Sequence, residues 1–313
     1  MLVAWKEFAK GKRKKLDVQE FQYRLMDNIL ELHRELKAGT YHHGEYQHFK
    51  ISDPKPRDIH KASVRDRIVH HALYRQLYPF FARTFIADSY SCQKGKGTHK
   101  AMDRFRAYAH KVSQNHTRTC YVLKCDIRKF FASIDQRALL SIVERYVTDA
   151  HIVALIKNVV ESFNSGVLGK GLPLGNLTSQ LFVNIYMNEF DQYAKHTLKA
   201  KHYVRYADDF VFLSQDREWL VSLLPRIATY LSEKLALELH PNKVSIQTFS
   251  SGIDFLGWVH FSDHHVLRTV TKRKMLRVLL EKADTEEVVM SYRGLLSHGN
   301  TVKLKTRVFL GNV

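Results

Sequence analysis

The chain has 313 residues, and 45% of them are hydrophobic, an ordinary share for a globular protein with a sizeable core. Its 49 lysines and arginines exceed its 31 aspartates and glutamates by 18, which favours a polyanionic partner, nucleic acid first and an acidic membrane surface second. No apolar run approaches the roughly 18 residues of a membrane-spanning helix, and the first residues lack a secretory apolar core. Cys92, Cys120 and Cys125 have no metal-type spacing and are too few for a disulfide framework. We therefore expect no membrane association and a reducing, cytoplasmic setting.

The first third of the sequence predicts helices around one strand-rich segment. A basic run over residues 10–15 has two interpretations that both remain open, a mobile solvated arm or a nucleic-acid contact. Residues 17–37 carry apolar side chains at steps of three or four and precede Gly39, which predicts a helix with a glycine stop. Residues 41–61 are aromatic and interrupted by two prolines, which favours two strands and a loop. A capping box at Ser63 then opens a second helix.

Two pairs of adjacent histidines, His42-His43 and His70-His71, are candidate metal ligands by residue type alone. Neighbouring side chains point in different directions on a helix or a strand, so we interpret them as surface or core histidines instead.

Residues 92–130 are the most basic part of the sequence, with ten lysines and arginines against two aspartates, Asp103 and Asp126. A loop containing Lys94 and Lys96 precedes a helix that ends near residue 113, and residues 121–127 read as a strand that ends with Asp126. So local a charge bias favours a surface for nucleic-acid phosphates, with Lys94 and Lys96 as contacts, over an ordinary solvated face.

The middle and the end of the chain mix helices and strands. Asp135 and Asp149 precede helical patterns and are predicted N-caps. Further predicted elements, in chain order, are a glycine-rich loop over 166–175, a helix over 177–198, a helix over 216–239 interrupted by Pro225, strands over 244–248 and 254–261, and a helix over 271–282. Helices and strands do not alternate strictly, so the predicted class is α+β.

Residues 202–213 predict a β-hairpin with Asp208 and Asp209 in its turn, between two apolar strands. Neighbouring carboxylates disfavour each other's ionisation unless a cation neutralises them, so the pair favours a divalent metal site. A solvated turn is the alternative, because Asp is a common turn residue. If the strand ending at Asp126 is a sheet neighbour of this hairpin, the three carboxylates suit two Mg²⁺ ions about 4 Å apart, as in polymerases and nucleases.

Several segments in this order resemble the motifs of reverse transcriptases. Tyr206-Ala207-Asp208-Asp209 is similar to the family's signature hairpin, and Asp126-Ile127-Arg128-Lys129-Phe130-Phe131 is similar to its first catalytic motif. Four further segments match later or earlier motifs: Lys55-Pro56-Arg57 with Arg65-Asp66-Arg67, Lys243 after His240-Pro241-Asn242, Phe255-Leu256-Gly257-Trp258, and Ser291-Tyr292-Arg293-Gly294.

The resemblance implies a right-hand polymerase. Its domains would be fingers with an N-terminal helical extension (1–115), a palm with an antiparallel sheet (116–262, with finger-associated helices over about 136–170) and a short α-helical thumb (263–313). The activity implied is RNA-directed DNA synthesis, with two Mg²⁺ ions as cofactors and dNTPs as substrates. The enzyme would bind a template RNA and the RNA–DNA hybrid.

The resemblance also assigns roles to single residues. Asp126, Asp208 and the carbonyl of Ile127 would bind metal, with Asp209 as a weaker or outer carboxylate. Lys243 would protonate the pyrophosphate leaving group as a general acid. The remaining assignments are nucleotide binding by Lys55, Arg57, Phe131 (under the sugar), Gly175, Asn176 and Gln180, a primer grip at Phe255, Leu256, Gly257 and Trp258, and nucleic-acid contacts on the thumb helix at Lys272, Arg273 and Lys274.

The loop over 171–180 departs from most members of the family. Leu174 stands where they carry Gln, and Gln180 stands where they carry Pro. This pattern is similar to reverse transcriptases of diversity-generating retroelements, bacterial or phage enzymes related to group II intron reverse transcriptases. They copy a template RNA with frequent errors at adenines and work with a small basic accessory protein, alone or as an oligomer. Leu174 would then lower fidelity. The alternatives are a retron-like or phage-defence reverse transcriptase, and a non-catalytic RNA-binding protein with the same fold.

Overall fold

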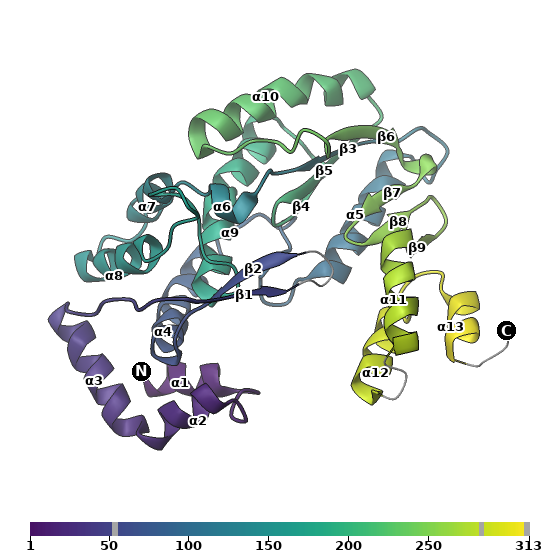
Figure 1. Ribbon diagram of the computed structural model, residues 1–313. Helices are drawn as coiled ribbons and strands as arrows, with labels where there is room; N and C mark the ends of the chain where they lie inside the picture. The colour runs from purple at the N-terminus through teal and green to yellow at the C-terminus, as the bar shows by residue number, and fades with distance from the viewer. Residues whose placement is uncertain (52–55, 282–284, 310–313) are drawn as a thin grey trace.

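The computed structural model describes residues 1–51, 56–281 and 285–309. The N-terminal helices lie at one lower corner of the molecule, the largest sheet lies above them, and the C-terminal helices lie at the opposite lower corner (Figure 1). No helix within the described residues has the length and apolarity needed to cross a membrane.

The N-terminal helices differ from the single helix predicted over 17–37. They are α1 (Leu2–Ala9), α2 (Leu16–Tyr23) and α3 (Leu25–Ala38). The predicted helix is divided at Arg24, whose φ of −115° and ψ of 41° are not helical. The Asn28 side chain donates to the Phe21 carbonyl at 3.0 Å, so a polar group compensates the break. Gly39 ends α3 with a left-handed φ of 71°, which confirms the predicted glycine stop.

The next elements confirm the predicted strands and capped helix. An antiparallel hairpin is followed by a long helix: β1 (Gln47–Ile51), β2 (Arg57–Lys61) and α4 (Val64–Phe81). The Ser63 hydroxyl accepts from the Asp66 backbone N–H at 3.1 Å, as the capping box predicts. The hairpin lies between the N-terminal helices and the largest sheet (Figure 1).

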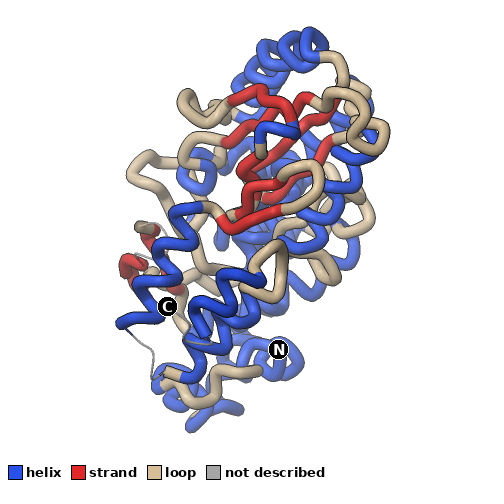
Figure 2. The backbone as a smooth tube through the Cα atoms, turned by 90° about the vertical axis from the view of Figure 1, so that its right-hand side faces the viewer, coloured by secondary structure: helices blue, strands red, loops and turns tan. Residues whose placement is uncertain are grey.

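The largest sheet has four antiparallel strands in the order β4-β5-β3-β6. Its strands are β3 (Tyr121–Asp126), β4 (Tyr203–Tyr206), β5 (Asp209–Ser214) and β6 (Ser245–Thr248). The helices packed on it are α5 (Thr98–Val112), α9 (Leu177–Gln192) and α10 (Arg217–Leu235). Side chains alternate across the strands, so Leu123 and Phe212 join the core under α9 and α10 whereas Val122 and Val211 join the core under α5. Figure 2 shows these strands in red with helices in blue around them.

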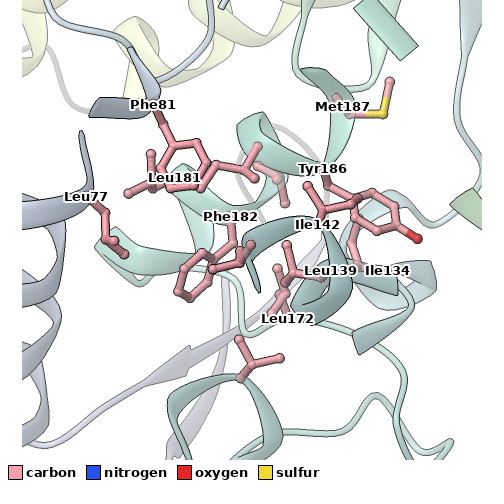
Figure 3. Packing of buried hydrophobic residues seen from close by; sticks show 14 of the residues in the cluster. Leu77, Phe81, Ile134, Leu139, Ile142, Leu172, Leu181, Phe182, Tyr186 and Met187 are labelled. Carbon is pink, nitrogen blue, oxygen red and sulfur yellow. The ribbon is translucent and has the colours of Figure 1, made fainter. Parts of the chain in front are cut away.

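The helices between β3 and β4 form the main core. They are α6 (Phe130–Ser133), α7 (Gln136–Glu144), α8 (Ala150–Glu161) and α9, which a short π-helix continues (Tyr193–Thr197). Asp135 and Asp149 cap α7 and α8, as predicted, by accepting backbone N–H groups at 2.9–3.0 Å. Side chains of α4, α7 and α9 meet around Phe182, with Leu172 of the glycine-rich loop against them (Figure 3).

The C-terminal part forms a smaller sheet and three helices. These elements are β7 (Ile253–Phe255), β8 (Trp258–His260), β9 (His265–Leu267), α11 (Thr269–Glu281), α12 (Glu286–Leu295) and α13 (Val302–Phe309), after a 3₁₀ turn at Phe249–Ser251. The single strand predicted over 254–261 is wrong. Leu256 and Gly257 have positive φ values of 54° and 87°, which is the geometry of a two-residue hairpin turn between β7 and β8.

Pro225 does not interrupt α10, which runs through it from Arg217 to Leu235. Proline has no N–H to donate to the Val221 carbonyl, but both Pro225 and Val221 are exposed, so that carbonyl is accessible to solvent. The domain boundaries at residues 115 and 262 stay a prediction.

Candidate active site

Asp126 and Asp209 lie directly opposite each other at the ends of neighbouring strands. The register of β3 and β5 pairs them, so both carboxylates leave the sheet on the same face. The Asp208 carbonyl accepts from the Ile127 N–H at 3.3 Å, which joins the hairpin turn to the end of β3. The strand that ends at Asp126 is therefore a sheet neighbour of the hairpin, as predicted. One detail is wrong: the turn consists of Ala207 (φ 56°) and Asp208, and Asp209 is already the first residue of β5.

The carboxylates are crowded and poorly compensated. Burial raises the pKa of Asp209 to about 7, and the charges of Asp126 and Asp208 add to this rise while Lys124 opposes it. The Lys124 ammonium lies 3.7 Å from Asp209 Oδ2, but Asp209 Oδ1 is buried and has no hydrogen-bond partner among the described residues. Burial and Asp126 also raise the pKa of Asp208. A cation bound between these groups would relieve both effects.

Lys243 lies beside the carboxylates. Its ammonium donates to Asp126 Oδ1 at 2.8 Å. The segment before it is fixed by the backbone, because the His240 N–H donates to the Asp126 carbonyl at 2.7 Å and Leu239 forms a β-bridge with Ile127. The lysine predicted from the later motif is thus a direct neighbour of a predicted metal ligand.

The donor set fits a magnesium ion only if substrate and water complete it. Within the described ranges, no group of three or more His, Cys, Asp or Glu side chains is arranged to hold a metal. Mg²⁺ is commonly held by one or two carboxylates, with waters and substrate phosphates as the remaining ligands. Asp126 and Asp208, with the orphaned oxygen of Asp209 nearby, match that requirement.

A cavity of about 750 Å³ unites residues from three distant segments, although none of the three carboxylates lines it. Arg57 of β2, Phe131 of α6 and Leu174 of the glycine-rich loop all line it. The positive charge of Arg57 opposes the rise in the pKa of Asp208, so the guanidinium is near enough to stabilise the Asp208 carboxylate. The three residues were assigned to nucleotide binding and fidelity separately, and the fold brings them together. Lys55, the other predicted triphosphate contact, lies outside the described residues.

The loop over 171–180 is attached to the β1–β2 hairpin. The His60 N–H donates to the Leu174 carbonyl at 3.1 Å, and the Asn176 amide donates to the His60 carbonyl at 2.7 Å. Asn176 is 2% exposed and its side-chain oxygen accepts from the Ala62 N–H, so its side chain supports the loop, and its predicted role in nucleotide binding stays a prediction. Gly175 has a φ of 105°, and a Cβ there would lie 3.0 Å from Ile59, so glycine lets the loop pack closely against β2. Its predicted contact with a nucleotide stays a prediction. Gln180 is half-buried on α9, and its predicted role stays a prediction.

The predicted primer grip divides into two kinds of residue. Phe255 and Trp258 are buried in two different cores, so they support the β7–β8 hairpin from within. Leu256 and Gly257 form its turn and are partly exposed, which leaves the turn as the part able to touch a primer.

The predicted nucleic-acid lysines also differ in their surroundings. The Lys96 ammonium donates to the carbonyls of Ile86, Ala87 and Ser89 at 2.6–3.1 Å, which occupies all three of its protons, so its predicted nucleic-acid contact stays a prediction. Lys94 lies over the Tyr74 and Tyr78 rings. The thumb contacts predicted on α11 (Lys272, Arg273 and Lys274) stay predictions, with Lys272 and Arg273 exposed.

One residue of the site was not singled out from the sequence, although it lies within the signature hairpin. Arg205 is 1% exposed and forms an ion pair with Asp191 of α9, through Nε at 2.7 Å and Nη2 at 2.6 Å. Its third nitrogen, Nη1, donates to the Ala207 carbonyl at 3.0 Å, directly beside Asp208. An arginine in an otherwise apolar strand is the signal that identifies such a partner.

An antiparallel sheet with paired aspartates at its strand ends, flanked by a separate hairpin and a helical C-terminal part, defines a right-hand nucleic-acid polymerase. Residues 50–260 match the family described as reverse transcriptase (RNA-dependent DNA polymerase), and the chain belongs to that family. Reverse transcriptase domains use divalent metal ions.

Curated relatives are distant in sequence. Protein YkfC of Escherichia coli K12 is 25% identical over 297 residues, covering 82% of this chain and 76% of its own length. A mitochondrial protein of Arabidopsis thaliana, nuclear intron maturase 4, is 26% identical over 174 residues, which cover 53% of this chain and 20% of the maturase.

Solved structures share the fold. A truncated apo telomerase of Candida tropicalis has a TM-score of 0.52 at 13% identity, covering 78% of this chain and 60% of the telomerase chain. The telomerase of Candida albicans in complex with a fragment of telomeric RNA has a TM-score of 0.51 at 14% identity, covering 72% of this chain and 45% of that chain. The chain thus spans less than two thirds of either telomerase.

Proposed function

We propose that this protein synthesises cDNA on a retroelement template RNA by nucleotidyl transfer. The observation that carries the proposal is the register that sets Asp126 opposite Asp209, with Asp208 in the adjoining turn. The cavity lined by Arg57 and Phe131 supports it, because the charge of Arg57 acts on the pKa of Asp208. Asp126 and Asp208, together with the Ile127 carbonyl, would hold two Mg²⁺ ions. Such ions, when bound, activate the attacking hydroxyl and stabilise the leaving oxygen.

The protein's own side chains would bind and orient the substrates. Arg57 can make bidentate contacts with the phosphates of an incoming dNTP. Phe131 forms a wall of the same cavity, where a ring under the sugar excludes a 2′-hydroxyl. Lys243 is close enough to the carboxylates to protonate the pyrophosphate oxygen as it leaves.

The finer assignment is a reverse transcriptase of a diversity-generating retroelement, error-prone at template adenines. The support is Leu174, which lines the cavity with an aliphatic side chain and therefore offers a base pair shape without a directed hydrogen bond. We further propose that the enzyme works in the cytoplasm with a small basic accessory protein. The relative named as an intron maturase fits a relationship to group II intron enzymes.

Primer extension tests the catalytic proposal. The wild-type protein should extend a DNA primer on an RNA template with Mg²⁺ and dNTPs, and EDTA should stop it. Asp208→Asn should abolish extension and leave RNA affinity largely unchanged, because it removes one metal ligand. Asp263→Asn is a matched control, since Asp263 is exposed and pairs with its neighbour His264, away from the metal site. Extension by the Asp208 variant would overturn the metal assignment.

The same assay separates the alternatives. A wild-type protein that binds RNA without extending any primer would be the non-catalytic RNA-binding protein. Products that do not follow the template sequence would indicate a template-independent polymerase of a phage-defence system. Templated products with errors concentrated at adenines would support the diversity-generating type.

A further inference from the structure

A second basic cavity lies at the opposite end of the hairpin strands from the catalytic turn. It has a volume of about 350 Å³ and lies among the end of α5, the segment before β4, the end of β5 and the start of α10. Ser214, on its rim, is five residues along β5 from Asp209, so the cavity is about 17 Å from the carboxylates. It is therefore separate from the active site.

The lining of the cavity gathers positive charge. Lys111, Lys199 and Lys201 line it together with His202, and none of its lining residues is an aspartate or glutamate. In the part of the chain that the structure describes, the three ammonium groups have no hydrogen-bond or ion-pair partner. Burial lowers the pKa of His202, and the charges of Lys111, Lys195 and Lys201 lower it further while Asp88, outside the lining, opposes them. Like charges held around one hollow repel each other unless an anion occupies it.

Trp219 adds an aromatic wall to this basic hollow. It is half-buried at the start of α10, whereas Trp5 and Trp258 are 4% and 3% exposed. Sites for single-stranded nucleic acid combine these two features, cations that neutralise phosphates and aromatic rings on which bases stack. The cavity volume is at the lower end of the range of small-ligand sites, about 300–1,000 Å³, which suits one or a few nucleotides of a chain.

We infer that this cavity, lined by Lys111, Lys199, Lys201 and Trp219, binds a single-stranded RNA segment outside the catalytic duplex. Lysines neutralise its phosphates and Trp219 stacks on a base. A basic accessory protein is repelled there by the same charges. An acidic protein is the competing occupant, but the tryptophan in the hollow favours a nucleic acid. The site would hold the template RNA at a second point, away from the reacting ends.

The test measures RNA binding while the active site is already filled. Protein saturated with a short chain-terminated RNA–DNA primer–template is titrated with a fluorescent oligouridylate. The variant Lys111→Ala/Lys199→Ala/Lys201→Ala should bind it at least about tenfold more weakly. The slope of log K against log salt should fall by about 2, since three contacts to a single strand contribute about 0.7 each. Extension of the same primer–template with a free 3′-hydroxyl on the primer should be unchanged, because no catalytic residue is altered. Failure of this inference is therefore distinguishable from failure of the polymerase assignment.

A second triple variant provides the matched control. Lys37→Ala/Lys157→Ala/Lys234→Ala removes the same charge from exposed positions on α3, α8 and α10. It should bind the oligouridylate almost as the wild type does. Equal weakening in both variants would reduce the effect to net charge and overturn the inference. Unchanged binding in the cavity variant would also overturn it and leave the acidic protein as occupant.

Tryptophan fluorescence provides a second readout. Oligouridylate should quench the emission of the wild-type protein, and Trp219→Phe should lose this quenching while it retains most of the affinity. Trp5 and Trp258 are buried, so quenching of the wild type is assigned to Trp219. Quenching that persists in Trp219→Phe would show that the RNA does not stack on Trp219 and would overturn the inference.

Discussion

Arg205 and Asp191 form a fully buried ion pair that ties the catalytic hairpin to helix α9. The guanidinium meets both carboxylate oxygens and then reaches the Ala207 carbonyl, so the turn that presents Asp208 is held from inside the protein. Tyr203 also donates to Asp191 at 2.8 Å, and Ser89 accepts from Arg205 at 3.0 Å. Each polar atom of the pair thus has a partner, which is what makes a buried charge tolerable.

Removing one member of this pair should be costly. We expect Asp191→Asn or Arg205→Met to lower the free energy of unfolding by about 3–5 kcal/mol, because the remaining partner is left buried without compensation. Urea unfolding measures the change. Extension activity at low temperature, where the variants remain folded, should also fall because the Asp208 turn loses its support.

The double variant Asp191→Leu/Arg205→Met separates stability from positioning. Replacing both charges with apolar groups should recover much of the lost stability, while the Ala207 carbonyl still lacks its donor. Extension should therefore remain low in a stable protein. Recovery of full activity would show that the ion pair acts on stability alone.

The wall formed by Phe131 should select the sugar of the incoming nucleotide. Phe131→Ala should raise the efficiency of ribonucleotide incorporation relative to dNTPs by about 10- to 200-fold, the range for a change in steric fit of 1–3 kcal/mol. Single-nucleotide extension with each substrate measures the ratio. Phe80→Ala, at a 46% exposed position, serves as the control. An unchanged ratio in Phe131→Ala would remove this residue from the nucleotide site.

Leu174 should govern fidelity. Leu174→Gln adds an amide at the cavity wall, and we expect it to lower misincorporation opposite template adenine several-fold because a directed hydrogen bond discriminates better than shape. Sequencing of products made on one template measures the error rate. Leu168→Gln makes the same chemical change at a residue that is 92% exposed and should have no effect. Equal error rates in all three proteins would contradict the role.

Local patterns predicted most of the elements, because caps, glycine stops and alternation act over a few residues. Ser63, Gly39 and the hairpin around Asp208 are examples. Two helix predictions were wrong because groups or solvent outside the local pattern can satisfy the backbone hydrogen bonds that the pattern leaves open. Arg24 breaks a periodic helix because Asn28 satisfies the open end, and Pro225 fits within α10 because its surroundings are solvated.

Site residues were predictable where residue type and order carried the chemistry. Asp126 and Asp208 belong to motifs, and their adjacency followed from the sheet. Asn176 has the same motif support, but its burial against β2 depends on how two distant segments pack. The pairing of Arg205 with Asp191 likewise arises from the packing of β4 on α9, which no local spacing encodes.

Acid should destabilise the protein partly through His70. Burial lowers the pKa of this histidine to about 3; the nearby His43, His71 and Arg67 lower it further, and Asp66 opposes them. The ring is 1% exposed, with Nε2 3.1 Å from His43 Nε2, and its Nδ1 has no hydrogen-bond partner within residues 1–51, 56–281 and 285–309. Below about pH 6.5 His70 binds a proton in the unfolded chain but not in the folded protein. The contribution of His70 to the free energy of unfolding is therefore fully present above that pH and is lost as the pH falls toward 3.

His70→Asn isolates this contribution. The variant should be less stable than the wild type at pH 7.5, but its loss of stability between pH 7.5 and 4.5 should be smaller by about 2 kcal/mol, since it has no proton to take up on unfolding. Urea unfolding at both pH values gives the two differences. His33→Asn, at an exposed position of α3, should keep the pH dependence of the wild type. If His70→Asn shows the same acid loss as the wild type, other groups cause it.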